Sequence, residues 1–534
     1  MNKLSYAKKT KAWKKLESFA LMNDYQDIEL LFSQHPNRGS EFSLNLDDLY
    51  FDYSRQLINP NILNTLISLA DQVGVSESIQ DMYSGECINT SENLPALHTL
   101  LRKPSEESFI FENKDILIDI NKERKKVKTT VNRLHDGELK GFDGSTITDV
   151  VNIGIGGSDL GIRMSVSALS EYRKKDLKVH FVSSLDGVEL AHTLSAVDPR
   201  KTIFIICSKS FSTLETLTNA NEAKKWFIDH TNELAIKDHF FAVSSDYKAM
   251  LEYGIVNDKC FKIWDWVGGR YSIFSSIGLT LALSIGWDNF EDLIHGAYRM
   301  DNHFRDSSLK ENIPVLLALI GIWNRNFLNI SSHAILPYDN HLEKFPSYLQ
   351  QLEMESNGKS LRKDGSLVGL STSALIWGES GSNAQHSFYQ FLHQGTDRVS
   401  LDFILPTNSG VNLQKQQDLV VLNCLAQSVA FSTNNPFSDS VNFINSKESY
   451  SGINPNSLIL FRDLSPRVLG SLIALYEHKV FVQGVIWGVN SFDQFGVEIG
   501  KNLFKNIKTI DNKIKSDLPS SIYHLLEIIN NIKR

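Results

Sequence analysis

The sequence predicts an α/β protein with two parallel-sheet domains, a helical N-terminal region and C-terminal helices. Short apolar runs rich in β-branched residues alternate with helical segments, and this alternation occurs in two separate blocks. Strand, helix and strand at such spacing are typical of right-handed βαβ units, which form parallel sheets. The 534 residues are enough for two such domains and the helical regions, because a chain of this length allows about three or four domain-sized units.

Residues 1 to about 115 are predicted to be mostly helical, because apolar residues such as Leu16, Phe19 and Ala20 recur at helical spacing. The first α/β block begins near residue 148. Its predicted strands are Asp149–Ile155, Val179–Ser183, Thr202–Cys207 and Phe240–Val243, and its predicted helices lie near 158–172, 188–197 and 213–231.

The second α/β block begins near residue 312. Its predicted strands are 332–337, 373–377, 400–405 and 457–461, and its predicted helices are 312–327, 342–354, 382–393, 412–430, 465–482 and 494–507. The predicted regions are therefore a helical N-terminal part at 1–115, α/β domains at 116–290 and 291–507, and a helical tail at 508–534.

Composition excludes several classes of protein. The 54 Lys and Arg against 62 Asp and Glu give a net charge of −8, which disfavours a general nucleic-acid binder. The longest apolar run, Ile313–Trp323, is shorter than the roughly 20 residues that span a bilayer. The basic N-terminus has no apolar segment behind it and does not resemble a secretory signal. The four cysteines, Cys87, Cys207, Cys260 and Cys424, are widely spaced and suit reduced thiols, so we expect a cytoplasmic enzyme without nucleic-acid or membrane partners.

A glycine-rich loop, NIGIGGSDLG at 152–161, follows the first predicted strand of the α/β block. Its glycines allow a ligand to approach the backbone, and Ser158 is placed to cap the next helix, whose N-terminus attracts anions. Asp159 stands where the dinucleotide-binding fingerprint needs glycine, and the P-loop Gly-Lys-Ser/Thr is absent. A tight strand-to-helix turn without a ligand remains an equally good explanation of this loop alone.

A second loop, SKSFSTLET at 208–216, follows the strand Thr202–Cys207. Ser208, Ser210, Ser212 and Thr213 supply four hydroxyls at a helix start, and Thr213 is placed to cap that helix. Hydroxyls and backbone N–H groups together can bind phosphate without a metal, and Lys209 adds a positive charge unless it is merely solvated. Two such loops at the carboxyl ends of strands in one sheet indicate a phosphate site in the crevice where α/β proteins bind ligands.

Four further segments contain candidate catalytic groups. Arg270 in GGRYS suits a cation for a substrate oxyanion, although most such arginines lie on turns at the surface. Glu353 and Glu355 lie near the end of a predicted helix that stops at Asn357-Gly358. A carboxylate there faces the negative end of the helix dipole, which favours a general base, but most are simply exposed.

His386 and His393 are seven residues apart and are predicted to share one helix face, where a structural histidine is the commoner case. Gln494 and Lys501 are likewise seven apart in SFDQFGVEIGK, which also reads as a bundle helix with a solvated lysine. No HExxH motif, cysteine pair or carboxylate–histidine cluster indicates a metal. The nucleophile elbow G-x-S-x-G is also missing.

Taken together, six segments resemble the glucose-6-phosphate isomerase (phosphoglucose isomerase) family. In order they are NIGIGGSDLG, SKSFSTLET, DWVGGRYS, ESNGK, GSNAQHSFYQFLHQGT and SFDQFGVEIGK. The resemblance covers roughly residues 45 to 505. It implies two sugar-isomerase (SIS-type) domains and an enzyme that interconverts D-glucose 6-phosphate and D-fructose 6-phosphate in glycolysis and gluconeogenesis.

The resemblance also implies a role for each matching residue. The sugar phosphate would be held by Gly157, Ser158, Ser208, Lys209, Ser210, Ser212 and Thr213. Glu355 would carry the proton between C1 and C2 beside Gln351, and Arg270 would stabilise the enediolate. His386 and Lys501 would assist ring opening, and Gln494 would line the site. His386 would come from the partner subunit, so an obligate homodimer with a shared active site is expected, with no metal or redox cofactor.

The chemistry explains these residue types. Aldose–ketose isomerisation removes a proton next to a carbonyl and returns it one carbon away, and one carboxylate can act first as base and then as acid. An always-protonated arginine suits the enediolate charge, and a histidine that titrates near neutrality suits ring opening.

The sequence departs from the family pattern at a few positions. Ser210 and Ser212 replace the usual threonines, and Leu214 replaces a glutamine. Cys87 and Leu94 stand where basic residues are usual. The first alternative function is a non-catalytic sugar-phosphate-binding regulator, which could dispense with Glu355, His386 and Lys501. The second is a nicotinamide-dependent dehydrogenase, which Asp159 disfavours.

Overall fold

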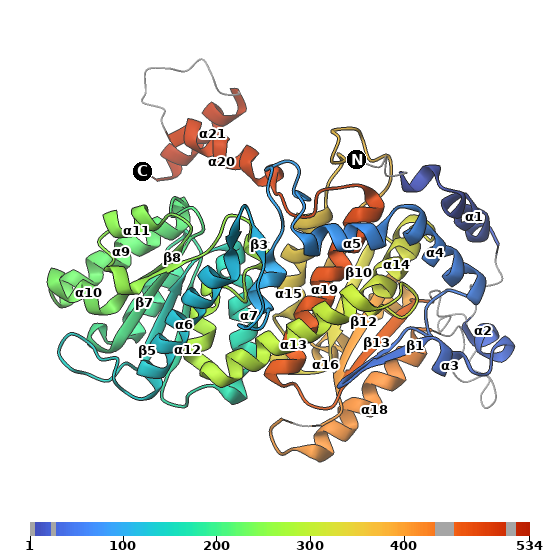
Figure 1. Ribbon diagram of the computed structural model, residues 1–534, viewed down its shortest axis with the longest axis horizontal. Helices are drawn as coiled ribbons and strands as arrows, with labels where there is room; N and C mark the ends of the chain where they lie inside the picture. Colours follow the sequence, from blue (N-terminus) through green and yellow to red (C-terminus); the bar gives the residue numbers. More distant parts are fainter. Residues whose placement is uncertain (1–5, 23–27, 409, 433–452, 509–519, 534) are drawn as a thin grey trace. The chain divides into compact units, whose positions relative to one another are not determined.

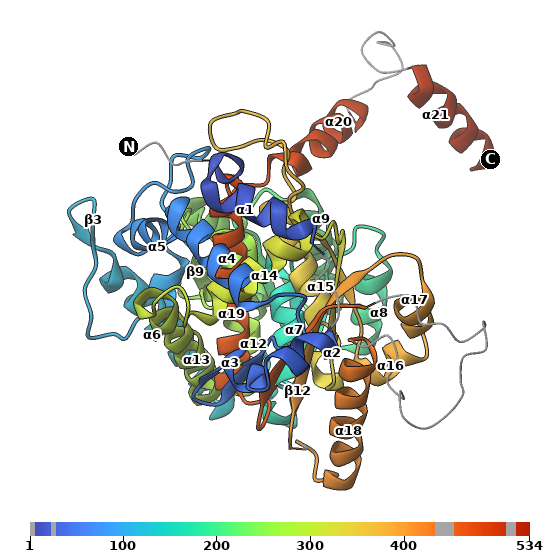
Figure 2. The same ribbon diagram turned by 90° about the vertical axis from the view of Figure 1, so that its right-hand side faces the viewer.

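The computed structural model describes residues 6–22, 28–408, 410–432, 453–508 and 520–533. These residues form two compact units, Met1–Ser491 and Phe492–Arg534. The three sheets of the described residues, two large ones and one of two strands, belong to the first unit (Figures 1 and 2). The α/β class that the sequence predicts is confirmed. None of the helices in these parts of the chain is long and apolar enough to cross a bilayer.

The first sheet has five strands in the order β6-β5-β7-β8-β9, and every neighbouring pair is parallel. The strands are β5 (Asp149–Ile153), β6 (Lys178–Val182), β7 (Thr202–Cys207), β8 (Phe240–Ser244) and β9 (Cys260–Lys262). Four of them match the predicted strands to within two residues at each end. The three-residue strand β9 is not predicted from the sequence. Because all five run in the same direction, the loops that follow β5 and β7 leave the same edge of the sheet.

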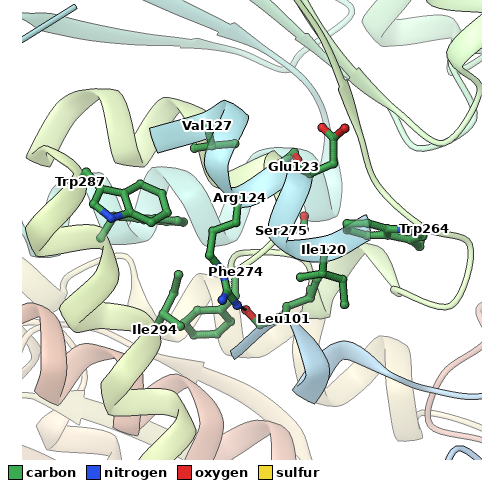
Figure 3. A pocket seen from close by; sticks show the side chains of 12 residues that line it. Leu101, Ile120, Glu123, Arg124, Val127, Trp264, Phe274, Ser275, Trp287 and Ile294 are labelled. Carbon is green, nitrogen blue, oxygen red and sulfur yellow. Dashed lines mark hydrogen bonds between the residues drawn. The ribbon is translucent and has the colours of Figure 1, made fainter. Parts of the chain in front are cut away.

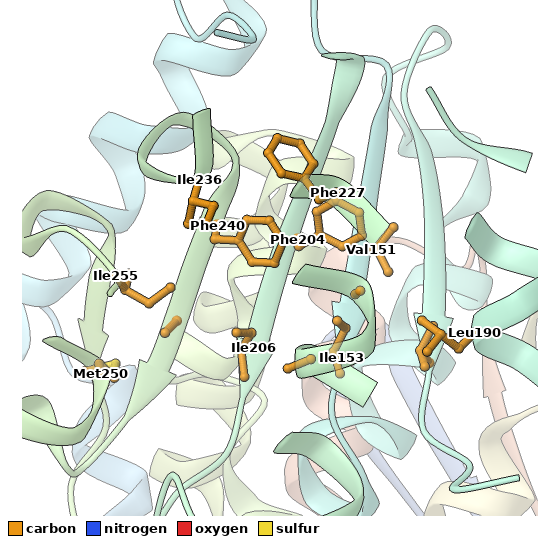
Figure 4. Packing of buried hydrophobic residues seen from close by; sticks show 14 of the residues in the cluster. Val151, Ile153, Leu190, Phe204, Ile206, Phe227, Ile236, Phe240, Met250 and Ile255 are labelled. Atoms are coloured by element: carbon orange, nitrogen blue, oxygen red, sulfur yellow. The ribbon is translucent and has the colours of Figure 1, made fainter. Parts of the chain in front are cut away.

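The helices of this block are α6 (Ile116–His135), α7 (Leu160–Ala168), α8 (Val188–Ala196), α9 (Leu214–His230), α10 (Ile236–His239), α11 (Tyr247–Glu252) and α12 (Leu279–Ile285). Apolar residues of α8 and α9 pack on one face of the sheet (Figure 4). Phe204, Phe227 and Phe240 form the aromatic part of this core, and the rings of Phe204 and Phe240 stack 4.8 Å apart. This packing fixes the strand ends from which the site loops emerge.

The second sheet has six strands in the order β1-β2-β13-β12-β10-β11. Its parallel strands are β10 (Ser332–Pro337), β11 (Leu375–Gly378), β12 (Val399–Pro406) and β13 (Asn456–Phe461). The hairpin β1 (Ser43–Leu46) and β2 (Leu49–Asp52) extends it, and β2 pairs antiparallel with β13. The four predicted strands of this block are parallel as expected, but part of the N-terminal region, which the sequence predicts to be mostly helical, adds an antiparallel hairpin at the edge.

The helices of this block are α13 (Trp287–Asp306), α14 (Ile313–Asn326), α15 (Phe345–Leu349), α16 (Gly381–Gln385), α17 (Tyr389–Gln394), α18 (Gln414–Ala430) and α19 (Pro466–Trp487). The predicted continuous helix 382–393 is wrong, since α16 ends before His386 and α17 begins at Tyr389. Between them lies Phe388, whose φ of −135° is not helical and whose ring lies 4.5 Å from that of Trp377 of β11. His386 and His393 therefore do not share a helix face.

The N-terminal region contains α1 (Lys11–Ala20), α2 (Ile28–Gln34), α3 (Arg38–Glu41), α4 (Pro60–Gln72), α5 (Val75–Ser84) and the small hairpin of β3 (Ile110–Phe111) and β4 (Lys114–Asp115). The unit Phe492–Arg534 contains α20 (Glu498–Lys508) and α21 (Ser520–Ile532). The helix predicted at 494–507 begins four residues later than expected. Gln494 precedes it in non-helical geometry, so Gln494 and Lys501 do not lie on one helix.

Candidate active site

The glycine loop links β5 to α7 and lies directly against the segment that contains Arg270. A Cβ at Gly157 would collide with the backbone of Gly269, so the glycine at position 157 lets the loops touch. The hydroxyl of Ser272 donates to Gly157 O at 3.3 Å. Gly156 has a φ of 60°, and a Cβ there would stand 3.2 Å from Gln351 Nε2. The loop thus brings together three segments that are more than 75 residues apart in sequence.

Ser158 is not the helix cap that the sequence suggests. It closes a 3-10 turn, Gly156–Ser158, and its carbonyl accepts from Asn152 Nδ2 at 3.1 Å. Asp159 occupies the N-cap position of α7, and its buried carboxylate accepts from Arg163 Nε at 3.0 Å. Burial raises the pKa of Asp159, although the charge of Arg163 opposes the shift. The residue that breaks the dinucleotide fingerprint therefore has a structural ion pair of its own.

The hydroxyl loop follows β7 and leads into α9. Its hydroxyls pair with one another, since Ser208 Oγ lies 3.1 Å from Thr213 Oγ1 and Ser210 Oγ lies 2.8 Å from Ser212 Oγ. Thr213 does occupy the N-cap position, but its side chain does not cap the helix. The first N–H groups of α9 have no carbonyl one turn back to bond, which makes this helix start a suitable anion site.

Phe211 anchors the hydroxyl loop in a strained conformation. Its φ of 46° lies in the left-handed region, which a bulky residue rarely adopts. The side chain is buried, and its ring meets Tyr253 edge-on at 5.6 Å. Strain of this kind persists where surrounding contacts compensate for it and is common at functional sites.

Lys209 is held in place and is not freely solvated. Its Nζ donates to Asp265 O at 2.7 Å, and its carbonyl accepts from Ser245 N at 2.9 Å and from Ser244 Oγ at 2.8 Å. Burial lowers the pKa of Lys209, while the charges of Asp265 and Glu92 act in the opposite direction. This lysine thus connects the hydroxyl loop to the strand-end segment that leads to Arg270.

Arg270 is buried and firmly oriented, contrary to the alternative that it is a surface turn residue. It is 2% exposed and lies in a 3-10 turn, Gly269–Tyr271. Its Nε donates to Ser356 Oγ at 2.5 Å and its Nη2 donates to Ser491 O at 2.6 Å. These contacts leave its Nη1 facing Glu355, whose Oε2 is 3.8 Å away.

Gln351 and Glu355 lie on a π-helical turn, Gln350–Glu355, that continues α15. Such turns are rare and are often found at functional sites. Four residues apart, the two side chains share one face of the turn, while Glu353 faces the other way. Glu353 is buried and its Oε1 accepts from Lys479 Nζ at 2.5 Å. The structure therefore separates the two candidate carboxylates: Glu353 belongs to a buried ion pair and Glu355 faces Arg270.

Two polar atoms on this face are buried without a hydrogen-bond partner among the described residues, Gln351 Oε1 and Glu355 Oε2. Thr216 in the first turn of α9 has a hydroxyl in the same condition. Buried polar groups are normally paired, so unpaired ones beside two loops suited to an anion suggest a polar ligand. Together these groups offer a carboxylate, a fixed cation and an anion site, which suits proton transfer next to a carbonyl of a phosphorylated substrate.

Comparison with known proteins agrees with this geometry. The sequence profile of the phosphoglucose isomerase family matches residues 52–526. The chain belongs to the phosphoglucose isomerase family.

Individual relatives in this family cover nearly the whole chain. A glucose-6-phosphate isomerase of Francisella philomiragia is 44% identical over 93% of this chain and 94% of its own length, and one of Acinetobacter baumannii is 44% identical over 94% and 93%. The crystal structure of a glucose-6-phosphate isomerase from Chlamydia trachomatis superposes with a TM-score of 0.88 at 29% identity, covering 98% of this chain and all of that one. A hypothetical protein from Thermus thermophilus, at 23% identity and a TM-score of 0.65, shares the fold.

Not every residue that the family resemblance singles out lies beside Glu355. His386 follows the last turn of α16, where its side chain is exposed. Within the described parts of the chain, no hydrogen bond or ion pair joins it to Arg270 or Glu355. Gln494 and Lys501 belong to the unit Phe492–Arg534, where Lys501 Nζ donates to Glu498 Oε1 at 2.7 Å. The first unit therefore brings together the two loops, Arg270, Gln351 and Glu355.

Three further residues lie at the candidate site without having been predicted as part of it. Thr216 ends the segment SKSFSTLET, and a hydroxyl in the first turn of α9 is a recognisable signal. Ser356 and Ser491 orient Arg270, and the Tyr271 hydroxyl also lies 3.0 Å from Ser356 Oγ. Nothing in the sequence marks these two serines, because their role depends on contacts across 86 and 221 positions.

A separate small cavity of about 20 Å³ lies beside α6 and α13 (Figure 3). It is lined mainly by apolar side chains such as Leu101, Phe274 and Trp287. Its Arg124 is satisfied by carbonyls, donating to Leu101 O at 2.8 Å and to Lys103 O at 3.0 Å. None of the predicted site residues lines this cavity, so we regard it as a packing feature.

Proposed function

We propose that this protein is a glucose-6-phosphate isomerase that interconverts D-glucose 6-phosphate and D-fructose 6-phosphate. The observation that carries the proposal is the buried Arg270 opposite Glu355 at 3.8 Å. The glycine loop lies against the neighbouring Gly269, and the hydroxyl loop is joined to the same segment through Lys209 and Asp265. A sensor of sugar phosphates needs the loops alone. Isomerisation also needs a cation and a carboxylate beside them, and Arg270 and Glu355 supply both.

The phosphate site consists of backbone and hydroxyl donors. Gly157 and Ser158 of the glycine loop and Ser208, Lys209, Ser210, Ser212 and Thr213 of the hydroxyl loop hold the phosphate. The start of α9 contributes free N–H groups and the positive end of its dipole. Lys209 supplies the charge, and its tether to Asp265 O keeps it at the loop.

Glu355 carries the proton between C1 and C2. As a carboxylate it removes the proton at C2, and as a carboxylic acid it returns that proton to C1. Arg270 stabilises the negative oxygen of the enediolate that forms between these steps, and Gln351 contacts the sugar from the same face as Glu355. Positioned acid–base groups typically contribute about 10²–10⁴-fold to the rate.

His386 and Lys501 assist ring opening, and Gln494 lines the site. The exposed position of His386, without a contact to Glu355 in its own chain, fits a site to which a second subunit contributes this histidine. The outer face of α18 supports such an assembly, because Leu419 and Leu422 are mostly exposed there. We therefore propose an obligate homodimer that acts in the cytoplasm, in glycolysis and gluconeogenesis, and that needs no metal or redox cofactor.

A coupled assay for fructose 6-phosphate formation tests the proposed function. The assay is run on the purified protein alone, with added nicotinamide cofactor and with a chelator. Equal rates of fructose 6-phosphate formation in all three support the isomerase. If no fructose 6-phosphate forms, reduction of the nicotinamide in the second arm supports the dehydrogenase, and absence of any reaction supports the regulator.

Mixing two inactive variants tests the shared site. Glu355→Gln and His386→Ala are unfolded together and refolded as a mixture. If each site takes His386 from the partner, mixed dimers contain one site with neither substitution, and activity reappears. If both residues act within one chain, every site stays defective and the mixture remains inactive.

A further inference from the structure

We propose that the buried Glu353–Lys479 ion pair positions the Glu355 carboxylate by anchoring the π-helical turn from the side opposite the substrate. This inference rests on the proposed function, because it concerns the geometry of proton transfer. Glu353 and Lys479 do not touch substrate in this account, so they are positioning residues.

Few contacts on the site face hold the Glu355 side chain in place. Among the described residues its carboxylate accepts no hydrogen bond, and the charge beside it, Arg270, is 3.8 Å away. Its position is therefore set mainly by the backbone of Gln350–Glu355. A π-helical turn is intrinsically less favourable than an α-helical one, so tertiary contacts must hold it.

The opposite face of the turn is anchored by the ion pair between Glu353 and Lys479. Glu353 Oε1 accepts from Lys479 Nζ at 2.5 Å, and both side chains are almost completely buried, at 3% and 1% exposure. Leu352 is buried beside it. Removing one partner of such a pair leaves an uncompensated charge in the interior, so the pair strongly resists separation.

Lys479 is itself held firmly in place. It lies in the middle of α19, a 22-residue helix whose central residues are all buried. Its ammonium lies over the ring of Tyr476 at 5.3 Å, and the Tyr476 hydroxyl donates to Asp402 Oδ2 at 2.9 Å. Burial would raise the pKa of Asp402, but the charges of His333 and Lys479 hold it below its usual range. The anchor thus reaches β12, in the second sheet.

Further contacts join α19 to the residues that follow Glu355. Asn357 Nδ2 donates to Val480 O at 2.8 Å, directly after Lys479, and Ser491 Oγ donates to Asn357 Oδ1 at 2.7 Å. Ser491 O in turn accepts from Arg270. The same helix therefore fixes both sides of the Arg270–Glu355 pair. A displacement of about 1 Å in such a geometry can cost about 10²-fold in rate.

Three variants test the proposal: Glu353→Gln, Lys479→Met and the double variant. We expect kcat to fall about 10²-fold in the single variants, while KM for the sugar phosphate changes little because the phosphate loops are untouched. The matched control is Lys259→Met, which removes a buried lysine that donates to Asp238 O in α10. It should lower the melting temperature and leave kcat of the folded protein unchanged.

Folding is checked by circular dichroism and thermal unfolding. If a single variant does not fold, the double variant decides, because removing both charges leaves none unpaired and is often nearly neutral for folding. Its kcat should still be low, since the anchor is gone. Wild-type kcat in a folded single or double variant would overturn the proposal. Failure of the proposed function is distinguished because the unmodified protein would then form no fructose 6-phosphate.

Discussion

The two sides of the candidate active site are held by different kinds of contact. The glycine and hydroxyl loops, at the ends of β5 and β7, are held by backbone hydrogen bonds and by hydroxyls that pair with one another. Ser210 and Ser212 are exposed there. By contrast, Arg270 and Glu355 are oriented by buried polar and charged side chains, including Ser356 and the Glu353–Lys479 pair.

This difference predicts which side tolerates substitutions. Several donors on the binding side can meet the same phosphate, so the loss of one is shared among the others. On the chemical side each group has one position and one task. We therefore expect substitutions on the chemical side to lower kcat steeply and substitutions on the binding side to raise KM by smaller factors.

The largest expected effect is that of Glu355→Gln. The amide keeps the shape of the side chain but cannot take the proton from C2, so kcat should fall by about 10²–10⁴-fold. Steady-state kinetics and binding of a non-reacting sugar phosphate measure the two effects separately. Binding should stay within a few-fold of the unmodified protein, and near-normal turnover would remove Glu355 from its proposed role.

Arg270→Lys should have the next largest effect. Lysine keeps the charge but cannot donate to Ser356 and Ser491 while also facing the substrate, so kcat should fall by about 10²–10³-fold. The measurement is kcat of the folded variant. A loss confined to KM would instead place Arg270 on the binding side of the comparison.

Gly157→Ala tests the contact between the two sides. The added methyl group would collide with the backbone of Gly269 and separate the glycine loop from Arg270. Overpacking of this kind typically costs about 1–3 kcal/mol, so both the melting temperature and kcat/KM should fall. Gly144→Ala serves as a control for the loss of a glycine, because its Cβ would meet no atom within 4 Å, although its positive φ adds strain. An unchanged kcat/KM in Gly157→Ala would show that the two loops need not touch.

Ser208→Ala should have the smallest effect. It removes one hydroxyl of several at the phosphate site and the partner of Thr213, which is typically worth about 0.5–1.5 kcal/mol. KM should rise by about 3–10-fold with kcat nearly unchanged, as steady-state kinetics will show. A much larger rise in KM, or a fall in kcat, would mean that the binding side is as sensitive to substitution as the chemical side.

The binding side could be predicted from the sequence because its signals are local. Glycines and hydroxyls directly after buried strands indicate an anion site, and parallel strands bring the two loops to one edge. Details that depend on contacts between distant parts of the sequence could not be predicted. Ser158 and Thr213 stand close to helix starts, but neither side chain caps its helix. The short strand β9 and the hairpin β1–β2 contain too few residues for a clear alternation.

The chemical side could be predicted only through the family resemblance. Glu353 and Glu355 are equivalent in the sequence, and the choice between them depends on Lys479, which is 126 positions away. The residues Gln350–Glu355 are compatible with an ordinary α-helix, so the π-helical turn leaves no mark in the sequence. The break after α16 contains neither glycine nor proline, so nothing in the local sequence indicates it.

The most direct test of the central claim follows an isotope. Glucose 6-phosphate labelled with deuterium at C2 is incubated with the unmodified protein and with Glu355→Gln, and the label is located by NMR. If Glu355 carries the proton, the unmodified protein removes deuterium from C2 and delivers it partly to C1 and partly to water. The variant should leave the label at C2 over the same time. Removal of the label by Glu355→Gln at the unmodified rate would contradict the account.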